Sequence, residues 1–445
     1  MSVDNIAAIS TALSASGVAV IRISGDSPLS IAEKMFTPVG KTGVIDFEPY
    51  KMYVGEIHAD TFNDFGMCVY FKGPKSFTGE DVVEFHCHGG IAITKGILKK
   101  ILSLGARLAT NGEFTKRAFM NGKLSLSSAE GLIDMINSES ESGVKAGYYL
   151  YREKLTKEIN DLQDMITDVL AQVDADMDFP EEDLEETSTL AVADTLKTVS
   201  QRVEDLLKTY RAGRTLKNGV KVGIVGKPNT GKSSLLNALL DYDKAIVSDI
   251  AGTTRDIVEG SIDIDGVRFN FLDTAGIRES EDKVEELGVV LSKKVLDESD
   301  LILFVLDASN ITDDDEQIYS LVKDKNLLFA VNKTDKSSFK DERADIYVSA
   351  LKKENLDQLK ALIYNKTIGH GIDLNGDFLC EERHFMALSK AKEKFAFALN
   401  NIGSVPLDIL AIDVKDGWDA LGEISGRTAT EDIINNIFSK FCVGK

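Results

Sequence analysis

The chain has little of what marks a secreted or membrane-spanning protein. It holds only four cysteines, and no two of them form a CxxC pair, which argues for a reducing compartment and against a disulfide framework. No apolar run approaches 18 residues, and no basic segment precedes an apolar one near the N-terminus. We therefore expect neither a membrane helix nor a signal peptide, and we expect the protein to be cytoplasmic with no membrane partner.

Positive charge is also scarce. The chain has 51 basic and 72 acidic residues, which gives a net charge of −21. Such a surface repels nucleic acid as a whole, so any contact with RNA has to be local or supplied mainly by a partner. With 445 residues, the chain is long enough for about three domains, each with its own core.

What the sequence does contain is a phosphate-binding loop. Residues 226–234 read GKPNTGKSS, between an apolar run at 220–225 and a helical run at 235–240. The glycines allow backbone N–H groups to curl around phosphate oxygens, and the helix N-terminus adds partial positive charge. Lys232 is predicted to reach the β- and γ-phosphates, and Ser233 to ligate Mg²⁺. Taken alone, the loop has one alternative, a glycine-rich turn without a ligand.

The base is specified about 100 residues later, where the apolar run 327–331 ends in the sequence NKTD at 332–335. The carboxylate of Asp335 can accept hydrogen bonds from guanine N1 and N2. Adenine lacks both donors and would leave the carboxylate unpaired, so a site of this kind discriminates strongly. A second apolar run at 346–348 leads into Ser349, Ala350 and Leu351, the predicted backbone contact to guanine O6.

Two further motifs lie between the phosphate loop and the base motif. Thr254, in the sequence GTTRD, is predicted to ligate Mg²⁺; Asp273 and Gly276, in DTAG after the apolar run 269–272, are predicted to sense the γ-phosphate. Motifs in this order predict an α/β GTP-binding domain. The predicted GTP-binding residues are Asn229, Thr230, Gly231, Lys232, Ser233, Ser234, Ser248, Asp249, Ile250, Ala251, Gly252, Thr253, Thr254, Asp273, Thr274, Ala275, Gly276, Asn332, Lys333, Asp335, Ser349, Ala350 and Leu351.

The way in which this domain would hydrolyse GTP is less obvious. Ras-like GTPases orient the attacking water with a glutamine after DTAG, but here Ile277 occupies that place. Two candidates stay open for the missing functions. Asn229 can join the carbonyls of 248–253 in ligating a monovalent cation, and the acidic stretch 279–286 can supply a carboxylate; most of that stretch is typical of a solvated helix face.

The rest of the chain predicts a multidomain protein. Residues 1–118 mix short β-rich runs with a helical run at 93–104, typical of an α+β domain. Two helical stripes follow in residues 119–215, and three more helical segments (385–399, 406–421 and 431–441) occupy 371–445. We expect a discontinuous helical bundle into which the GTPase domain, 216–370, is inserted. The stripes are Leu155, Ile159, Leu162, Ile166, Val169, Val173 and Val192, Leu196, Val199, Val203, Leu206, Tyr210.

Two short segments have less certain roles. Residues 174–186 hold eight acidic and no basic side chains, with Pro180 among them, which predicts a solvated connection unless it docks a basic partner. The sequence HCH at 86–88 resembles a metal-binding motif. On a strand, however, its cysteine and histidines point to different faces, which favours packing over metal binding.

Several long motifs outside the GTPase domain carry a family resemblance. They are GPKSFTGEDVVEFHCHGG at 73–90, GEFTKRAFMNGKLSLSSAEGLIDMI at 112–136, DFPEE at 178–182 and FCVGK at 441–445. With these motifs the chain resembles, from end to end, the MnmE (TrmE) family of bacterial tRNA-modification GTPases. The clearest departure is the sequence SASG at 14–17, where the family usually has a Pro-Gly-rich stretch.

The resemblance implies a function that the residues alone would not reveal. It implies a homodimer acting with the FAD-dependent protein MnmG (GidA) to add an aminomethyl-type group to C5 of the wobble uridine of certain tRNAs. The one-carbon donor would be 5,10-methylenetetrahydrofolate (or 5-formyltetrahydrofolate as a bound analogue). The residues implied for folate are Arg22, Glu84, Lys123 and Lys445. Without the resemblance, these would be read as ordinary surface charges.

The resemblance also implies how GTP is hydrolysed. K⁺ would take the part of an arginine finger, Glu285 would position the attacking water, and Cys442 would take part in the modification reaction. Without the resemblance, Cys442 would be read as an incidental packing residue. The residues implied for K⁺ are Asn229, Ser248, Ile250 and Thr253.

Other functional classes share a GTPase domain of this kind. A ribosome-assembly GTPase usually adds an RNA-binding module in a basic setting, which the acidic helical flanks disfavour. A metallocluster-maturation scaffold needs a dense ligand set, and only Cys380, His384 and Cys442 follow the GTPase domain. A nucleotide-switched interaction protein without a modification role is the third alternative.

Overall fold

The computed structural model describes residues 4–178, 185–242, 260–273, 295–369 and 378–445. The chain divides into two compact units, one of residues 1–133, 150–201 and 387–445, the other of residues 134–149 and 202–386. The second unit therefore interrupts the first in sequence, as a domain inserted between halves of a bundle would. The sequence did not indicate that 134–149 belongs with the inserted unit, and the domain boundaries at 118, 215 and 370 stay predictions.

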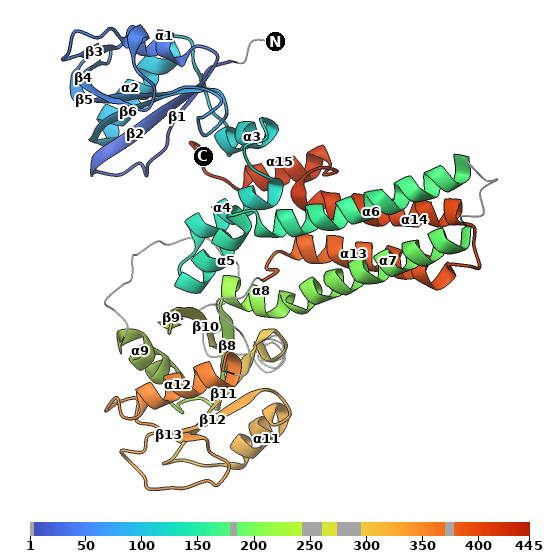
Figure 1. The fold of residues 1–445 in the computed structure, drawn as a ribbon. Coiled ribbons are helices and arrows are strands. Elements are labelled where there is room, and N and C mark those ends of the chain that lie inside the picture. The colour runs from blue at the N-terminus through green and yellow to red at the C-terminus, as the bar shows by residue number, and fades with distance from the viewer. Residues whose placement is uncertain (1–3, 179–184, 243–259, 274–294, 370–377) are drawn as a thin grey trace, which may run out of the picture. The chain divides into compact units, whose positions relative to one another are not determined.

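The first unit begins with a mostly antiparallel sheet (Figure 1). Among the described residues its strand order is β3-β4-β5-β6-β2-β1-β7. The strands are β1 Ile6–Ile9, β2 Ser16–Gly25, β3 Phe36–Pro38, β4 Met52–His58, β5 Asn63–Phe71, β6 Asp81–Gly89 and β7 Arg107–Leu108. Helix α2 (Ile91–Ser103) packs against β1, β2 and β6, with the short helices α1 (Pro28–Glu33) and η1 (Val44–Asp46) beside it.

Alternation along β6 explains how this sheet is buried. Phe85 and Cys87 belong to the core cluster that includes Ile97 and Ile101 of α2. Glu84, His86 and His88 alternate with them and point to the opposite face. The short β-rich runs and the helix 93–104 predicted within residues 1–118 are thus confirmed, and the histidines of HCH point away from its cysteine.

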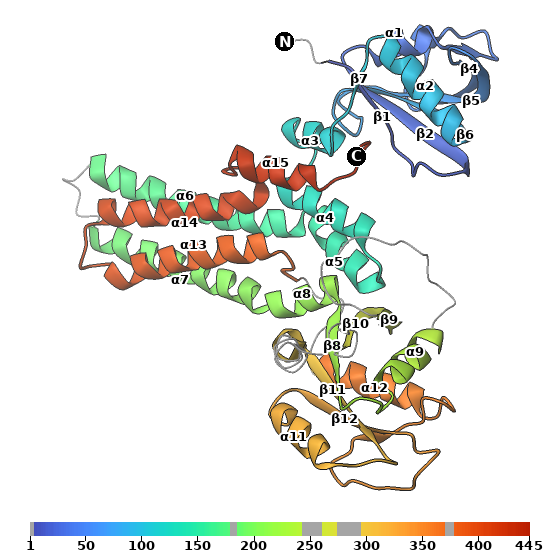
Figure 2. The ribbon, with the colours of Figure 1, turned by 180° about the vertical axis from the view of Figure 1, so that it is seen from behind.

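The helical part of the first unit is built on the predicted stripes. The helices of residues 113–208 and 382–439 are α3 Glu113–Met120, α4 Leu126–Asn137, α5 Glu141–Tyr151, α6 Lys154–Asp178, α7 Glu185–Lys208, α13 Glu382–Asn401, α14 Leu407–Ser425 and α15 Glu431–Ser439. Of these, α5 belongs almost wholly to the second unit, and α4, α7 and α13 cross the boundary between the units. All six stripe residues of α6 and the first four of α7 are buried. Side chains from α6, α7, α13 and α14 line one small apolar crevice, and both views show these helices side by side (Figures 1 and 2). No helix among the described residues is long and apolar enough to cross a membrane.

The acidic connection is shorter than predicted. Helix α6 continues to Asp178 and α7 begins at Glu185, so the helices include both ends of the expected connection 174–186. Pro180 disfavours helical backbone at the residue before it, which still leaves α6 free to run to Asp178. Residues 179–184 lie outside the described part of the chain.

The second unit contains a largely parallel sheet with the order β13-β12-β11-β8-β10-β9 among the described residues. Its elements are α8 Tyr210–Asn218, β8 Val220–Val225, α9 Lys232–Tyr242, β9 Gly260–Ile264, β10 Val267–Asp273, β11 Leu301–Asp307, α11 Asp313–Val322, β12 Leu327–Asn332, β13 Ile346–Tyr347 and α12 Leu356–Thr367. Of the strands described in this sheet, only β9 runs antiparallel to its neighbour. Strand β11 is buried throughout, as expected for a central parallel strand. The strands predicted from the nucleotide-binding motifs are confirmed as β8, β10, β12 and β13.

Candidate functional site

The phosphate loop lies where it was predicted, between the end of β8 and the start of α9. Gly231 has φ +91°, a conformation that side chains rarely adopt, and a Cβ there would lie 2.5 Å from Asn332 Nδ2. Glycine is therefore required at position 231 for two reasons: the backbone conformation, and the close approach of Asn332 in the neighbouring NKTD segment (332–335), which is called the base loop below. Because β8 lies between β10 and β11, the loop emerges from the middle of the carboxyl edge of the sheet, where such folds bind nucleotides.

The side chain of Lys232 folds back onto this loop. Its Nζ donates to the carbonyl oxygens of Gly226 (2.7 Å) and Lys227 (3.0 Å). The Thr230 hydroxyl donates to the same Lys227 carbonyl at 3.0 Å. Ser233 and Ser234 follow in the exposed first turn of α9. The arrangement places an ammonium, a helix N-terminus and the Ser233 hydroxyl together, the set that holds phosphates and Mg²⁺ in loops of this pattern.

The base motif is attached directly to the phosphate loop. Asn332 is buried, its Nδ2 donates to Thr230 O at 3.0 Å, and its Oδ1 accepts from Ala350 N at 3.2 Å. Lys333, with φ 63°, donates through Nζ to Asn229 O at 2.6 Å. The loops for base and phosphate are therefore held in one fixed relation by side chains of the base motif.

Asp335 is prepared to act as a hydrogen-bond acceptor. The Ser349 hydroxyl donates to Asp335 Oδ1 at 2.6 Å and holds the pKa of this carboxyl below its usual value. An ionised carboxylate accepts at both oxygens, and guanine presents the two matching donors. Leu351, which follows Ser349 and Ala350 in the chain, is largely exposed.

Asp307 is a residue of this site that the motifs did not indicate. It ends β11, and its Oδ2 accepts from Lys333 Nζ at 2.7 Å. Burial opposes its ionisation, but the bonds from Lys333 and Ser309 outweigh burial and lower the pKa of Asp307. The only sequence signal was an acidic residue closing a run of buried apolar residues.

Several predicted residues lie outside the described part of the chain. The structure therefore leaves all the K⁺ ligands, Asn229 included, the Thr254 contact to Mg²⁺ and the role of Glu285 as predictions. These residues are Ser248, Asp249, Ile250, Ala251, Gly252, Thr253, Thr254, Thr274, Ala275, Gly276, Glu285 and, for its side chain, Asp273.

Two of the residues implied for folate, Arg22 and Glu84, lie on the face of the N-terminal sheet opposite helix α2, which is called its outer face below. Arg22 of β2 and Glu84 of β6 are paired across the strands, with Nε 2.7 Å from Oε1. The Arg22 guanidinium lies 5.4 Å from the Phe77 ring centroid and 5.6 Å from that of Phe114. Burial alone would raise the pKa of Glu84, but the nearby His86 ring and the Arg22 charge outweigh it and lower the pKa. An ion pair whose arginine lies close to two aromatic rings is thus present here.

Two other elements approach the same part of the sheet. Lys123 Nζ donates to Pro74 O at 2.8 Å, in the β5–β6 loop that also carries Phe77. At the C-terminus, Val443 pairs with Asn111, and Gly444 lies against the backbone of Ile9 in β1, next to the strand of Arg22. Lys445 follows at the end of this tail.

Cys442 begins the docked tail. Its thiol side chain is exposed, and its carbonyl accepts from Gly112 N at 3.4 Å. Nothing in these contacts assigns it a chemical role, so its part in the reaction stays a prediction.

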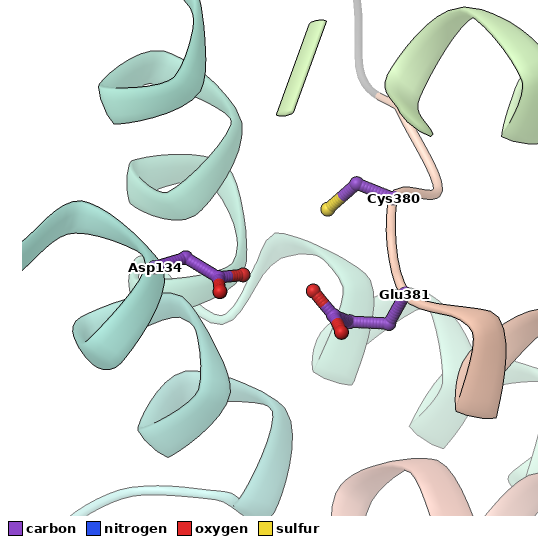
Figure 3. A group of neighbouring side chains, drawn as sticks. All are labelled: Asp134, Cys380 and Glu381. Carbon is purple, nitrogen blue, oxygen red and sulfur yellow. The ribbon is translucent and has the colours of Figure 1, made fainter. Parts of the chain in front are cut away.

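A second polar cluster, which the sequence did not indicate, lies in the inserted unit. Asp134 of α4 faces Cys380 and Glu381, and one ligand atom from each residue lies within 4.8 Å of the others (Figure 3). Lys217 Nζ lies 2.8 Å from Asp134 Oδ1 and also contacts Glu381. One ammonium therefore contacts two carboxyl groups, so the cluster contains its own positive charge.

This cluster makes the stability of the protein depend on pH. Burial and the neighbouring Glu381 raise the pKa of Asp134 from 3.8 to about 8. Between about pH 4 and 8, the unfolded chain ionises Asp134 but the folded chain does not, so the folded state loses stability as the pH rises. Asp134→Asn mimics the protonated acid, so its free energy of unfolding relative to the parent should rise by about 1–2 kcal/mol between pH 5 and pH 8.

Denaturant unfolding without nucleotide, across this pH range, measures the difference between variant and parent. Asp345→Asn serves as the control, because Asp345 also pairs with a lysine, Lys366 at 3.0 Å, but in a more exposed setting. A difference for Asp134→Asn that stays constant from pH 5 to pH 8 would contradict the protonation of Asp134.

Comparison with known proteins covers nearly the whole chain. A family model described as the MnmE helical domain matches residues 126–442, and one described as the GTP-binding protein TrmE N-terminus matches residues 5–123. The tRNA modification GTPase MnmE of Desulforamulus reducens is 40% identical over 458 residues, with 99% of each chain covered. That of Thermoanaerobacter pseudethanolicus is 41% identical over 460 residues, again with 99% of each covered.

A solved structure also matches part of the chain. The crystal structure of Era in complex with MgGDPNP and nucleotides 1506–1542 of 16S ribosomal RNA is 34% identical, with a TM-score of 0.28. The match covers 39% of this chain and 66% of that one.

Proposed function

Because the chain belongs to the MnmE family of tRNA modification GTPases, we propose that it hydrolyses GTP in the course of modifying the wobble uridine of certain tRNAs. The observation that carries the nucleotide assignment is the joining of the two loops. Lys333 and Asn332 bond to Asn229 and Thr230 of the phosphate loop, and Ser349 keeps Asp335 ionised for guanine. The family gives the purpose of that hydrolysis.

In the proposed reaction, Lys232 neutralises the β- and γ-phosphates while the Gly226 and Lys227 carbonyls hold its ammonium in place. Ser233 and Thr254 would hold Mg²⁺, which supplies charge neutralisation at the phosphates. Asn229 and the segment 248–253 would hold K⁺ in place of an arginine finger. Glu285 would orient the attacking water, with Asp273 and Gly276 sensing the γ-phosphate.

A reduced folate is proposed to bind at the Arg22–Glu84 pair. The Glu84 carboxylate can pair with the guanidine-like edge of a pterin, and Phe77 and Phe114 offer flat apolar surfaces beside it. Arg22, Lys123 and Lys445 provide positive charge for the anionic part of such a ligand. 5,10-Methylenetetrahydrofolate would bring the one-carbon unit, and Cys442 would act in its transfer.

Partners are proposed from the surface and the family. The outer face of the N-terminal sheet exposes Val18, Val54 and Phe65 at 47–58% of their surface, which suits a homodimer formed through this domain. Residues 1–123 hold 13 basic and 12 acidic side chains, so all of the excess negative charge lies beyond them. The N-terminal domain therefore suits contact with tRNA better than the remainder does. The flavoprotein MnmG is proposed to complete the reaction, in the cytoplasm.

The experiment that tests this function is mass analysis of wobble nucleosides from a strain lacking the gene. The strain should lack the modification, and the parent chain should restore it. Arg22→Ala should hydrolyse GTP normally yet fail to restore it, because the folate pair is lost while the nucleotide loops are unchanged. Cys442→Ser should behave in the same way.

Each outcome separates two explanations. A deletion strain with normal wobble nucleosides would remove the modification role altogether and leave a nucleotide-switched interaction protein. Full restoration by Cys442→Ser would show that the thiol is packing only, while the folate site would still stand on the result for Arg22→Ala.

A further inference from the structure

Lys227, the second residue of the phosphate loop, is anchored away from the nucleotide. We infer that Lys227 is a positioning residue for phosphate binding: its side chain clamps the loop to the start of helix α11, and its carbonyl then directs Lys232. The inference rests on the GTPase activity of the family and not on the proposed K⁺ or folate sites.

The clamp is a buried ion pair. The Lys227 side chain is 10% exposed, and its Nζ lies 2.8 Å from Oδ2 of Asp315, which is 3% exposed. The same ammonium donates to Thr312 Oγ1 at 3.2 Å and to Asn310 O. All three hydrogens of the ammonium are therefore directed at one segment, residues 310–315. A lysine left to contact phosphate or solvent would not be buried in this way.

The partner of Lys227 also caps a helix. Asp315 is the third residue of α11, and its Oδ2 accepts from Thr312 N at 2.9 Å in a capping box. Its other oxygen, Oδ1, is buried and has no partner among the described residues. One carboxylate oxygen thus serves both the helix cap and the clamp. Loss of Lys227 would leave a buried charge held only by the cap.

The clamp acts on Lys232 through the backbone. The Lys227 carbonyl accepts from Lys232 Nζ and from the Thr230 hydroxyl, at 3.0 Å each. Residue 227 therefore has little conformational freedom, because its side chain is bonded to residues 310–315 and its carbonyl is bonded to Lys232 and Thr230. The Lys232 ammonium is therefore held beside the loop, within reach of the β- and γ-phosphates, before any nucleotide arrives. Preorganisation of this kind lowers the ordering cost of binding.

A different contact serves the base. Asp307, at the end of β11, bonds to Lys333, which bonds to Asn229 O. The end of β11 and the segment that follows it thus contact both loops. Asp307 holds the base loop through Lys333. Asn310, Thr312 and Asp315 hold the phosphate loop through Lys227. Loss of Lys227 should consequently impair recognition of the phosphates and leave recognition of the base intact. General destabilisation of the domain would impair both.

The test compares three nucleotides by fluorescence competition on the full chain. Lys227→Met should weaken GDP and GTP binding at least tenfold and leave GMP within twofold of the parent, because Lys232 is expected to reach only the β- and γ-phosphates. Lys227→Arg can still pair with Asp315 and should keep most of the parent's affinity for GDP and GTP. Equal losses for GMP, GDP and GTP, or no loss of GDP affinity, would overturn the inference.

Two further variants keep the test decisive. If Lys227→Met does not fold because Asp315 is left unpaired, the double variant Lys227→Met/Asp315→Asn removes that charge and should show the same split. Arg343→Met is the matched control, since it breaks another ion pair of α11, Arg343 with Glu316 at 2.6 Å, without touching the phosphate loop. If Arg343→Met lost affinity for GDP and GTP to the same extent while keeping its affinity for GMP, the inference would also be overturned. A parent chain that binds no guanine nucleotide would instead refute the GTPase assignment itself.

Discussion

Asp335→Asn should bind GDP and GTP at least tenfold more weakly than the parent and should gain affinity for xanthosine nucleotides. The ionised Asp335 presents two acceptors, and Ser349 occupies part of one of them at 2.6 Å. An asparagine replaces one acceptor with an N–H₂ group that faces a donor of guanine. Xanthine has an oxygen where guanine has its amino group, so the amide then meets an acceptor. A tenfold change corresponds to about 1.4 kcal/mol.

Fluorescence titration with guanine and xanthine nucleotides measures both halves of this prediction. Asp341→Asn is a suitable control, because Asp341 also accepts hydrogen bonds in the same unit but pairs with Arg343 at 2.7 Å, away from the base loop. Unchanged GDP affinity in Asp335→Asn would mean that the NKTD segment does not recognise the base, whatever its attachment to the phosphate loop.

The nucleotide site was the part of the protein most open to prediction from sequence. Each of its motifs follows an apolar run, and parallel strands bring their carboxyl ends to one edge, so the order of motifs determines which side chains meet. Asn332 and Lys333 do meet the phosphate loop, as this logic requires. The helical stripes were equally accessible, because burial of α6 and α7 follows directly from the spacing of apolar residues.

Contacts between charged residues far apart in sequence were not predictable. Arg22 and Glu84 meet because β2 pairs with β6 in one register, and no local pattern specifies that register. Lys227 and Asp315 are 88 residues apart, and the sequence places Asp134 in the predicted helical domain but Lys217 in the predicted GTPase domain. A charged residue looks the same in sequence whether it is solvated or buried in a pair. The family resemblance, and not the spacing, indicated Arg22 and Glu84.

GTP turnover by the parent chain should be at least tenfold faster in KCl than in NaCl at equal ionic strength, and Asn229→Ala should abolish the difference. An arginine finger supplies charge worth 10³–10⁵ in rate, and no glutamine follows DTAG in this chain, so a bound cation is the proposed substitute. Asn229 has φ 66°, its side chain is exposed, and its carbonyl is occupied by Lys333. Its side-chain oxygen is the group we expect to hold the ion.

Equal ionic strength matters because general screening would otherwise change nucleotide affinity along with the rate. Asn229→Ala should keep GDP affinity within a few-fold, since the Lys333 bond uses the backbone of residue 229 and survives the substitution. A lower rate with unchanged affinity is the mark of an interaction made in the transition state. Equal turnover of the parent in the two salts would remove K⁺ from the mechanism, and the positive charge would then have to come from another residue or from a partner protein.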